Sequence, residues 1–551
     1  MAYEDDIVAE SMRELSSLQT MRATFESHWD EVARLVLPTF RNTFSPGSYN
    51  FPGEKKTAEQ IDATAALALS RFSAILDSLL TPRNSFWHAL TADNEDLAKV
   101  REVRLWFEMA TRVLFKERYK PTSNFSSQNL NTYVSLGAFG NGSLWVDHLQ
   151  SPEGGRGLRY RSIPLGEIYL RENFQGQVDG FCRRFRLNRT QAIQQFGEDV
   201  LPDIIKVATD INAQFMFLHR VCPRTDYDPG RRDNKAMPFA SYYCAVDGQK
   251  FLSEGGYRTF PAPTTRYDQT PGETYGRSPA MMVLPAIKTL NAEKRDFLTQ
   301  GHRAGTPVLL TTDDGMVDFS MRPGALNKGG MSADGKPLVG TLPVGNIQVT
   351  KEMMDEERLL INDAFLVTLF QILTEAPQMT ATEVIERTNE KGILLAPTVG
   401  RQQSEYLGPM IERELDLLAD AGLLPPMPPI LKEAQGEYTV VYTSPLAKAM
   451  RAQEVAGFGR TMEMLGGIVN ITQDPSVLDQ FDFDVISREV ADIQSVPESW
   501  MADPKLVEKK RTKRQEAMDA QQQIQAAPAA AAMMKAQAVQ QKAGGQQGAG
   551  K

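Results

Sequence analysis

Two helix-forming segments on either side of a stretch rich in glycine and proline constrain the fold more than any other feature of this chain. The first covers about residues 285–303 and would span about 28 Å at 1.5 Å per residue. The second covers about residues 351–373 and repeats apolar side chains at steps close to the period of one helix face. Residues 305–345 contain a strand-forming run at 307–310 and an Asp-Gly turn at 314–315. The pattern predicts a protrusion in which two helices carry a small, loop-rich unit at their tip.

Long helices also dominate the start of the chain. Apolar residues recur at steps of three or four from Val8 to Val36, and Pro38 ends this pattern. Similar patterns predict helices over about 57–80 and 96–119. Helices of this length indicate large layered packing rather than a small α/β sandwich.

The middle of the chain has the composition of strands and turns. The glycines within 137–142 predict a turn, and residues 143–146 then have the pattern of a strand. Short β-like runs occupy 158–187, and Asp-Gly at 247–248 predicts a type I′ hairpin over 239–252. We therefore expect an α+β fold that is predominantly α, with a β-rich module inserted among the helices.

The last third of the chain is predicted to be helical with breaks. Residues 380–420 form a helical stretch that Gly392 and Pro397 should kink or divide, and helix resumes over about 445–466. Residues 515–551 hold twelve Ala and ten Gln and end in a glycine-rich segment. Because this composition cannot form a packed core, we expect a disordered or marginally helical tail.

Charge is unevenly distributed along the chain. The 551 residues carry 60 Lys and Arg against 69 Asp and Glu, a formal net charge of −9. Residues 505–551 alone hold nine basic side chains against three acidic ones, so the remainder is more acidic than the total. An acidic body is a poor clamp for phosphate, which disfavours tight DNA binding by the main fold.

Cysteine usage and hydropathy exclude two further classes of protein. Cys182, Cys222 and Cys244 are too few and too scattered for a disulfide scaffold or a zinc site, and we expect them to be reduced thiols of an intracellularly made protein. The chain starts without the basic and apolar regions of a signal peptide. The strongest apolar run, 364–373, is half the length of about 20 residues that a membrane span needs, so we expect no membrane insertion.

Two motifs resemble catalytic sites but lack residues that the chemistry requires. Residues 330–337 nearly match a phosphate-binding loop, yet Pro337 follows Lys336 where a hydroxyl side chain would ligate Mg²⁺. Asp482 and Asp484 could hold Mg²⁺ in a nuclease, although a lone D-x-D at a helix start more often caps the helix. The five histidines never pair at metal-ligand spacing. We therefore expect no enzyme activity, no metal and no cofactor.

A basic run near the C-terminus is the best candidate by composition for phosphate contact. It consists of Lys509, Lys510, Arg511, Lys513 and Arg514. One interpretation is the solvated face of a terminal helix, and the other is contact with DNA. The sequence leaves both open.

Several stretches together resemble one protein family. Residues 274–280 and 284–291 look like the signature that opens the central helix of podoviral head-to-tail connectors, the portal proteins of short-tailed bacteriophages. Residues 379–387, followed by Glu390, resemble the most recognisable block of that family. The other similar stretches are 29–38, 137–142 and 479–492, the last followed by Val496, Arg511 and Arg514. The resemblance covers roughly residues 8–515.

The resemblance implies a ring of subunits, usually twelve, at one vertex of the viral capsid. Double-stranded DNA would pass through its central channel during packaging and ejection. The terminase large subunit and tail adaptor proteins would dock on the ring, which would also contact the major capsid and scaffolding proteins. Assembly would take place in the cytoplasm of the host bacterium.

The family plan also divides the chain into regions. The predicted protrusion corresponds to the stem and clip of such proteins. The resemblance implies a wing (1–280), stem helices (281–304 and 348–373), a clip (305–347), a tunnel loop with a long kinked helix and a return to the wing (374–444), a crown (445–514) and a tail (515–551).

An acidic or mixed channel wall would let duplex DNA slide, because many Lys and Arg contacts to phosphate would bind it too strongly for translocation. A few rings of positive charge could still steady the duplex. The candidates on the stem are Lys288, Lys294, Arg295 and Arg303, and the candidates on the tunnel loop are Glu375 and Gln378. The spacing of the four basic residues places them on more than one helix face, and ion pairs between subunits are an equal alternative for each.

Apolar side chains cover nearly the whole circumference of the second stem helix near its end. They include Phe365, Leu366, Leu369 and Phe370. A helix that is apolar all round must be buried on several sides. We interpret these residues as a subunit interface, with burial inside one subunit as an equal alternative.

Two other functions compete with a conduit. One is a nucleic-acid-processing enzyme of DNA packaging, either an ATPase with its site at Lys336 or a nuclease with its site at Asp482 and Asp484. The other is a generic virion scaffold through which no DNA passes.

Overall fold

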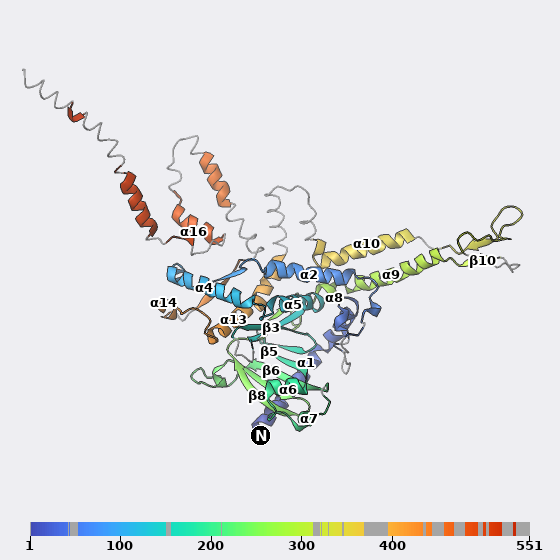
Figure 1. The fold of residues 1–551 in the computed structure, drawn as a ribbon, viewed down its shortest axis with the longest axis horizontal. Coiled ribbons are helices and arrows are strands. Elements are labelled where there is room, and N and C mark those ends of the chain that lie inside the picture. Colours follow the sequence, from blue (N-terminus) through green and yellow to red (C-terminus); the bar gives the residue numbers. More distant parts are fainter. Residues whose placement is uncertain are drawn as a thin grey trace, which may run out of the picture. The chain divides into compact units, whose positions relative to one another are not determined.

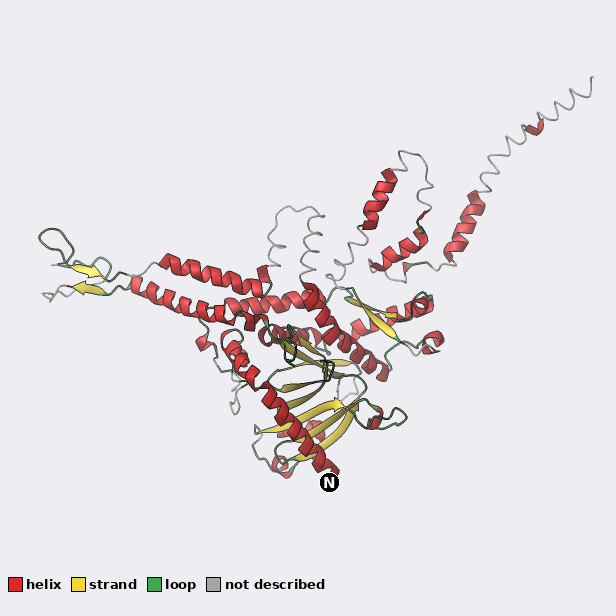
Figure 2. Cartoon of the chain, turned by 180° about the vertical axis from the view of Figure 1, so that it is seen from behind, coloured by secondary structure: helices red, strands yellow, loops and turns green. Residues whose placement is uncertain are grey.

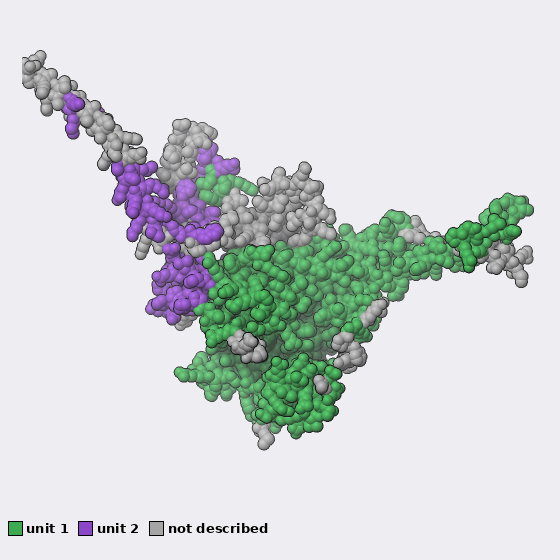
Figure 3. Space-filling model, viewed as in Figure 1, with its two compact units in different colours: residues 1–89, 111–424, 442–462 green, residues 90–110, 425–441, 463–551 purple. Residues whose placement is uncertain are grey.

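The computed structural model is a mixed α+β structure (Figure 1). It contains two compact units, shown in different colours in Figure 3. Unit 1 comprises residues 1–89, 111–424 and 442–462, and unit 2 comprises residues 90–110, 425–441 and 463–551. The structure describes residues 2–41, 43–44, 53–54, 56–149, 156–210, 212–311, 320, 322–328, 330–343, 347–368, 395–433, 437–443, 457–467, 480–493, 500–502, 506–518, 520 and 533–535.

Helices and strands occur largely in separate runs along the described residues, as the predicted α+β class requires. The α-helices are α1 (Ala2–Leu35), α2 (Thr64–Leu80), α3 (Glu95–Ala98), α4 (Arg101–Arg118), α5 (Phe125–Phe139), α6 (Arg189–Phe196), α7 (Asp203–Lys206), α8 (Pro279–Met282), α9 (Leu284–Gly305), α10 (Ile347–Ala364), α13 (Gly408–Asp420), α14 (Pro429–Glu433) and α16 (Phe483–Ile493). The strands are β1 (His88–Ala92), β2 (Asn141–His148), β3 (Leu158–Ile163), β4 (Ile168–Glu172), β5 (Val178–Asn188), β6 (Gln214–Pro223), β7 (Phe239–Ala245), β8 (Lys250–Tyr257), β9 (Thr264–Arg266), β10 (Leu309–Thr311), β11 (Val339–Thr341) and β12 (Tyr438–Tyr442). The short 3₁₀ turns η1, η2 and η3 cover Pro38–Phe40, Thr57–Glu59 and Asn234–Ala236, and η4 (Gln403–Leu407) is a π-helix.

The three helices predicted at the start of the chain are present, with shorter bounds for the second and third. Helix α1 ends before Pro38, as its apolar pattern indicates. Helix α2 begins only at Thr64, where the carboxylate of Asp62, two residues earlier, accepts the Thr64 N–H at 2.8 Å. The third predicted helix is interrupted, since α3 is a separate turn whose cap is the side chain of Asn94.

The predicted β-rich module is an antiparallel sheet in the order β4-β5-β6-β7-β8, packed between helices (Figures 1 and 2). Neighbouring residues of each strand face opposite sides. On one side Cys182, Leu218 and Cys244 pack against α1, and on the other Phe217 and Ala245 pack against α6 and α7. All three cysteines are buried free thiols in the structure.

Gly137 does not lie in a turn, contrary to the prediction. It lies inside α5, where a Cβ would meet the Leu69 Cδ1 of α2 at 2.6 Å. Only glycine lets the two helices approach this closely. The helix ends instead at Gly140, which has φ of 77° and is followed directly by β2.

The hairpin β7–β8 is present, but its turn differs from the predicted type I′. The turn covers residues 246–249, and positive φ angles occur at Gly248 and Gln249 rather than at Asp247. The carboxylate of Asp247 accepts the backbone N–H of Met216 on the neighbouring strand β6 at 2.7 Å. A contact distant in sequence therefore determines the conformation of this aspartate.

A fully buried ion pair joins α13 to the end of α4 within unit 1. The Arg118 guanidinium donates to both carboxylate oxygens of Glu414, one of them at 3.0 Å, and neither side chain is accessible to solvent. Tyr160 donates its hydroxyl to Glu414 at 2.5 Å, and the Nε2 of His88 lies 3.0 Å from the guanidinium. The aromatic ring of Trp87 faces the guanidinium carbon at 4.5 Å.

The surroundings of this pair keep each group in one charge state. Burial, followed by the positive charge of Arg118, lowers the pKa of His88 well below its ordinary value, so the imidazole is neutral and accepts a hydrogen bond from the guanidinium. Burial lowers the pKa of Arg118, but the charge and hydrogen bonds of Glu414 outweigh this effect and raise it. The pair is thus charged and fully hydrogen-bonded in the interior.

We predict that Glu414→Gln lowers the free energy of unfolding by about 3–5 kcal/mol, because it leaves the Arg118 charge buried without a partner. Denaturant unfolding monitored by circular dichroism measures the loss. The matched control is Arg231→Ala, which removes an exposed pair with Asp233 and should change the free energy of unfolding little. A Glu414→Gln loss as small as that of the control would contradict the prediction.

Candidate functional site

A helical hairpin projects from unit 1 and carries a small two-stranded sheet at its far end (Figure 1). Helix α8, capped by the Ser278 hydroxyl on the Met281 N–H, leads directly into α9, and α10 returns beside α9. Side chains set the register of the two helices. The Thr350 hydroxyl donates to the Gln300 side chain at 3.5 Å. Nearer the root, burial and then the negative charge of Glu357 raise the pKa of Glu293. This hairpin confirms the predicted helix–tip–helix protrusion.

The root of the hairpin is tied to the segment before α2. The Asn291 side-chain oxygen accepts the N–H groups of Ile61 and Asp62 at 2.9 and 3.1 Å, and Arg358 donates to the Asp62 carboxylate at 2.9 Å. Burial raises the pKa of Asp62, but hydrogen bonds from Thr64 and Arg358 outweigh it and lower the pKa. The sequence reasoning missed this anchor, since Arg358 and Asp62 are 296 residues apart and no local pattern links them.

The second helix of the hairpin is shorter than predicted. Helix α10 ends at Ala364, whereas the prediction extended it to residue 373. Phe365 and Leu366 form a turn in which Leu366 has φ of 60°, and residues 367–368 are helical again. Phe365 is fully buried and its ring packs edge-on against Phe72 of α2. The structure therefore places Phe365 in the interior of its own subunit, the second of the two interpretations that the sequence left open.

Of the other candidates near this turn, the structure describes only Leu366. Leu366 is half-buried. Leu369 and Phe370, proposed for a subunit interface, and Glu375 and Gln378, proposed for a channel, lie outside the described residues.

The tip of the hairpin is a small unit with many exposed apolar side chains. Strands β10 and β11 pair antiparallel, with Leu309 opposite Thr341, and Met331 bridges Pro337 in the loop between them. The exposed apolar side chains of this unit are Val308, Leu310, Leu326, Met331, Leu338 and Leu342. The tip therefore leaves six large apolar side chains open to solvent.

The near-match to a phosphate-binding loop lies in this tip and does not have the required geometry. The N–H groups of Ser332 and Leu338 donate to the carbonyls of Lys336 and Gly330, and the Gly335 N–H donates to the Ser332 carbonyl. These donors are therefore not free for phosphate, and no helix begins after Lys336 within the described residues of the tip. The near-match therefore lacks features that a phosphate-binding loop needs, in addition to the hydroxyl side chain missing at Pro337.

The four basic candidates on α9 do not share one environment. Lys288 donates to Glu31 of α1 at 2.6 Å, and the Lys294 ammonium lies 5.6 Å from the ring of Phe297. Arg295 and Arg303 are exposed, and neither forms a salt bridge within the part of the chain that the structure describes. These two arginines are therefore open to a partner outside the subunit.

The acidic and basic candidates near the C-terminus lie in unit 2. The Asp482 carboxylate accepts the N–H groups of Asp484 and Val485 and so caps α16, and Asp484 forms a salt bridge with Arg511 at 2.5 Å. Asp482 therefore has the capping role that the sequence favoured over a magnesium site, and the salt bridge of Asp484 with Arg511 was not predicted. The other basic residues of the run, Lys509, Lys510, Lys513 and Arg514, are exposed on the helical residues 506–518.

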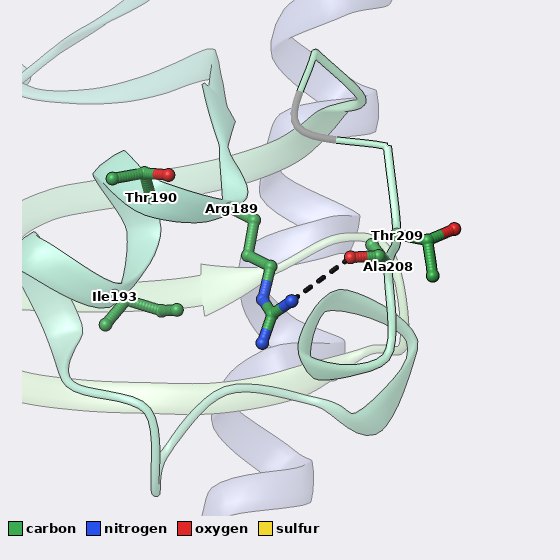
Figure 4. A pocket seen from close by; sticks show the side chains of 5 residues that line it. All are labelled: Arg189, Thr190, Ile193, Ala208 and Thr209. Atoms are coloured by element: carbon green, nitrogen blue, oxygen red, sulfur yellow. Dashed lines mark hydrogen bonds between the residues drawn. The ribbon is translucent and has the colours of Figure 1, made fainter.

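A cavity of about 230 Å³ lies on the β-rich module, remote in sequence from these candidates. Figure 4 shows its lining, which includes Arg189, Ile193 and Thr209. The Arg189 guanidinium donates to the Ala208 carbonyl at 3.2 Å and pairs with Glu198, so the charged group of the cavity is already engaged. The other residues of the lining are Thr190 and Ala208.

Two further classes of site are absent from the described residues. No cluster of three or more His, Cys, Asp or Glu side chains among them could hold a metal ion. Nor does any of the described helices combine the length and apolar character that crossing a membrane requires.

The described residues thus define a class of mixed α+β protein that projects a helical hairpin with exposed apolar side chains at its tip. Comparison with known proteins gives this class a name. The profile of the family described as "Bacteriophage head to tail connecting protein" matches residues 9–501. A protein of Bordetella phage BPP-1 named "Probable portal protein" is 30% identical over 501 residues, covering 89% of this chain and 87% of its own length. The "Portal protein" of Salmonella phage epsilon15 is 26% identical over 485 residues, covering 86% and 85%.

The chain belongs to the bacteriophage head-to-tail connecting protein family, which confirms the resemblance found in the sequence. Its function is that of a phage portal, which connects the head of the particle to the tail. The family is a structural one. Nearly all of the chain takes part in the match, so the hairpin and its tip are parts of this connector.

We predict that Asp62→Asn destabilises the protein by about 1–2 kcal/mol at pH 7, because the hydrogen-bonded charge that holds Arg358 is lost. The pKa of Asp62 is lowered on folding, so its stabilisation is present above the ordinary pKa of 3.8 and is lost as the pH falls through the lower folded value. Urea unfolding at matched protein concentration should therefore show a difference at pH 7 that shrinks below pH 3.8.

The matched control is Asp355→Asn, which removes an exposed partner of the same Arg358 and should change stability little. Equal losses in the two variants, or a loss in Asp62→Asn that does not depend on pH, would count against the anchor.

Proposed function

We propose that this connector assembles head to tail into a closed ring, of twelve copies if it follows the family pattern, at one vertex of the capsid in the virion. Double-stranded DNA passes through the ring during packaging and ejection, and the ring forms in the cytoplasm of the host bacterium. The observation that carries this proposal is the family match across residues 9–501, which includes the hairpin.

In this proposal the hairpin is the stem, and the tip unit is the clip that faces the motor and the tail. The terminase large subunit would dock there during packaging and tail adaptor proteins afterwards, because the tip exposes apolar side chains such as Leu310 and Leu326. The wing would contact the major capsid and scaffolding proteins. The boundaries are those of the sequence analysis: wing 1–280, clip 305–347, tunnel loop and kinked helix 374–444, crown 445–514 and tail 515–551.

The charge of the chain supports a conduit rather than a DNA clamp. A net charge of −9 gives little attraction for a polyanion, and strong local binding would oppose movement of the duplex. On α9 the lysines Lys288 and Lys294 already have partners within the subunit. Glu375 and Gln378 on the tunnel loop, and Leu369 and Phe370 at a subunit interface, remain proposals.

We propose no bond-making step for this chain. A packaging ATPase would need the loop at Lys336 to present free N–H groups, and these donate to carbonyls of the tip. A nuclease would need Asp482 and Asp484 to be free for Mg²⁺, and they cap α16 and pair with Arg511. A structural connector therefore accounts for the same residues without an active site.

Native mass spectrometry of the purified full-length chain tests the proposal. We expect a species at twelve times the subunit mass of 61.3 kDa, and negative-stain images of annular particles with an axial hole. Monomers or solid globular particles would refute the ring. ATP turnover by the purified protein alone would favour the packaging enzyme instead.

The basic run near the C-terminus offers a second test of contact with DNA. We predict that replacing Lys509, Lys510, Lys513 and Arg514 by Gln weakens binding of the assembled protein to duplex DNA and makes it less dependent on salt. Removing one lysine or arginine that binds a phosphate should reduce the slope of log affinity against log salt by about 0.9. Unchanged affinity and slope would identify the run as a solvated helix face.

A further inference from the structure

The exposed side of α10 carries an acidic stripe. Glu352, Glu356, Leu359 and Asp363 follow one another at steps of four, three and four, which places them in one row along the helix. Glu356 and Asp363 form no salt bridge within the described residues. Leu359 and its neighbour Leu360 remain 59% and 53% exposed, so apolar surface adjoins the acidic groups.

The exposed side of α9 carries a basic stripe. Lys288, Arg295 and His302 are spaced seven residues apart, two helical turns each, so they share one face with Arg303 at its edge. Leu298 is exposed beside this row. The acidic residue nearest to this basic row in sequence is Asp296, one residue beyond Arg295. The two helices of the hairpin therefore expose opposite charges.

The two stripes lie on opposite flanks of the hairpin. Within the subunit, α9 faces α10 through Glu293 and Gln300, and α10 faces α9 through Thr350 and Glu357. At 100° per residue, Arg295 is about 200° around the helix from Glu293, on the side away from α10. By the same count the row that contains Glu356 points away from α9. One copy thus has a basic flank where the next copy in a ring would have an acidic one.

The heights of the charges also match. Gln300 lies level with Thr350, so by antiparallel counting Arg295 lies level with residue 355 and Lys288 with residue 362. Glu356 and Asp363 are each one residue, about 1.5 Å, from these levels. Lys288 and Arg295 are about 10.5 Å apart along α9, as are Asp363 and Glu356 along α10. Rotation about a ring axis moves a residue sideways without raising it, so a hairpin standing along the axis presents each charge at the height of its counterpart.

We propose that the stem interface between neighbouring copies is this contact: the basic flank of α9 in one subunit docks on the acidic flank of α10 in the next, with Arg295 opposite Glu356. This inference rests on the ring proposed above and names the surfaces that close it. Lys288, although bonded to Glu31, stands opposite Asp363, and Leu298, Leu359 and Leu360 become covered. The contact is heterologous, and electrostatic complementarity gives it direction and register.

Charge reversal tests the pairing. We expect Arg295→Glu and Glu356→Arg each to abolish rings at a subunit concentration at which the original protein is fully assembled, because every interface repeats the repulsion. The double variant Arg295→Glu/Glu356→Arg should restore rings. Native mass spectrometry reads the assembly state, and circular dichroism verifies that each subunit is folded, which we expect because both side chains are exposed.

The matched control for Arg295→Glu is Lys351→Glu, which makes the same change of net charge at an exposed position of α10 outside the stripe and should leave rings intact. Rings that persist in both single variants, or that fail to return in the double variant, would overturn the pairing. Persistent Arg295→Glu rings with weakened, less salt-dependent DNA binding would also overturn it and assign Arg295 to the channel. Absence of rings from the original protein would instead refute the ring on which the pairing rests.

Discussion

The buried pair of Arg118 and Glu414 is the interaction on which the organisation of unit 1 most depends. It joins the end of α4 to α13, nearly 300 positions later in the chain, and Tyr160 of β3 and the neutral His88 complete its hydrogen bonds. A charge in the interior is tolerated only when every partner is in place. The pair therefore specifies one arrangement of these segments.

The hairpin is also held by contacts between residues distant in sequence, but these contacts are less buried than the Arg118–Glu414 pair. Asn291 and Arg358 tie its root to the segment before α2. Its outer flanks stay exposed, and Arg295 and Glu356 on them form no salt bridge within the described part of the same subunit. A root fixed by hydrogen bonds, together with flanks whose exposed charges are open to a partner, suits an element that repeats around a ring. The net negative charge of the chain is compatible with this role, because a DNA channel needs a wall that binds the duplex weakly. Contact between neighbouring copies needs flanks of complementary charge.

Much of the fold could be predicted because its signals are local. Apolar periodicity located α1, α9 and the strands of the β7–β8 hairpin, and Gly and Pro marked the tip unit. The errors occurred where distant residues decide. Gly137 serves the approach of α5 to α2 rather than a turn, Asp247 bonds the neighbouring strand β6, and α10 stops where Phe365 turns inward against Phe72. For the candidate site, the sequence identified the basic residues of α9 but not which of them have partners within the subunit.

The sequence by itself determined the α+β class, the helix–tip–helix protrusion and the membership of the connector family, because periodicity, turn residues and family motifs are properties of neighbouring residues. Only the tertiary structure decided which charges are satisfied. Lys288 meets Glu31 and Arg358 meets Asp62 across long stretches of chain, whereas Arg295 and Glu356 remain exposed on opposite flanks of one hairpin. Pairing of charges depends on distance in space, and a linear pattern does not encode that distance.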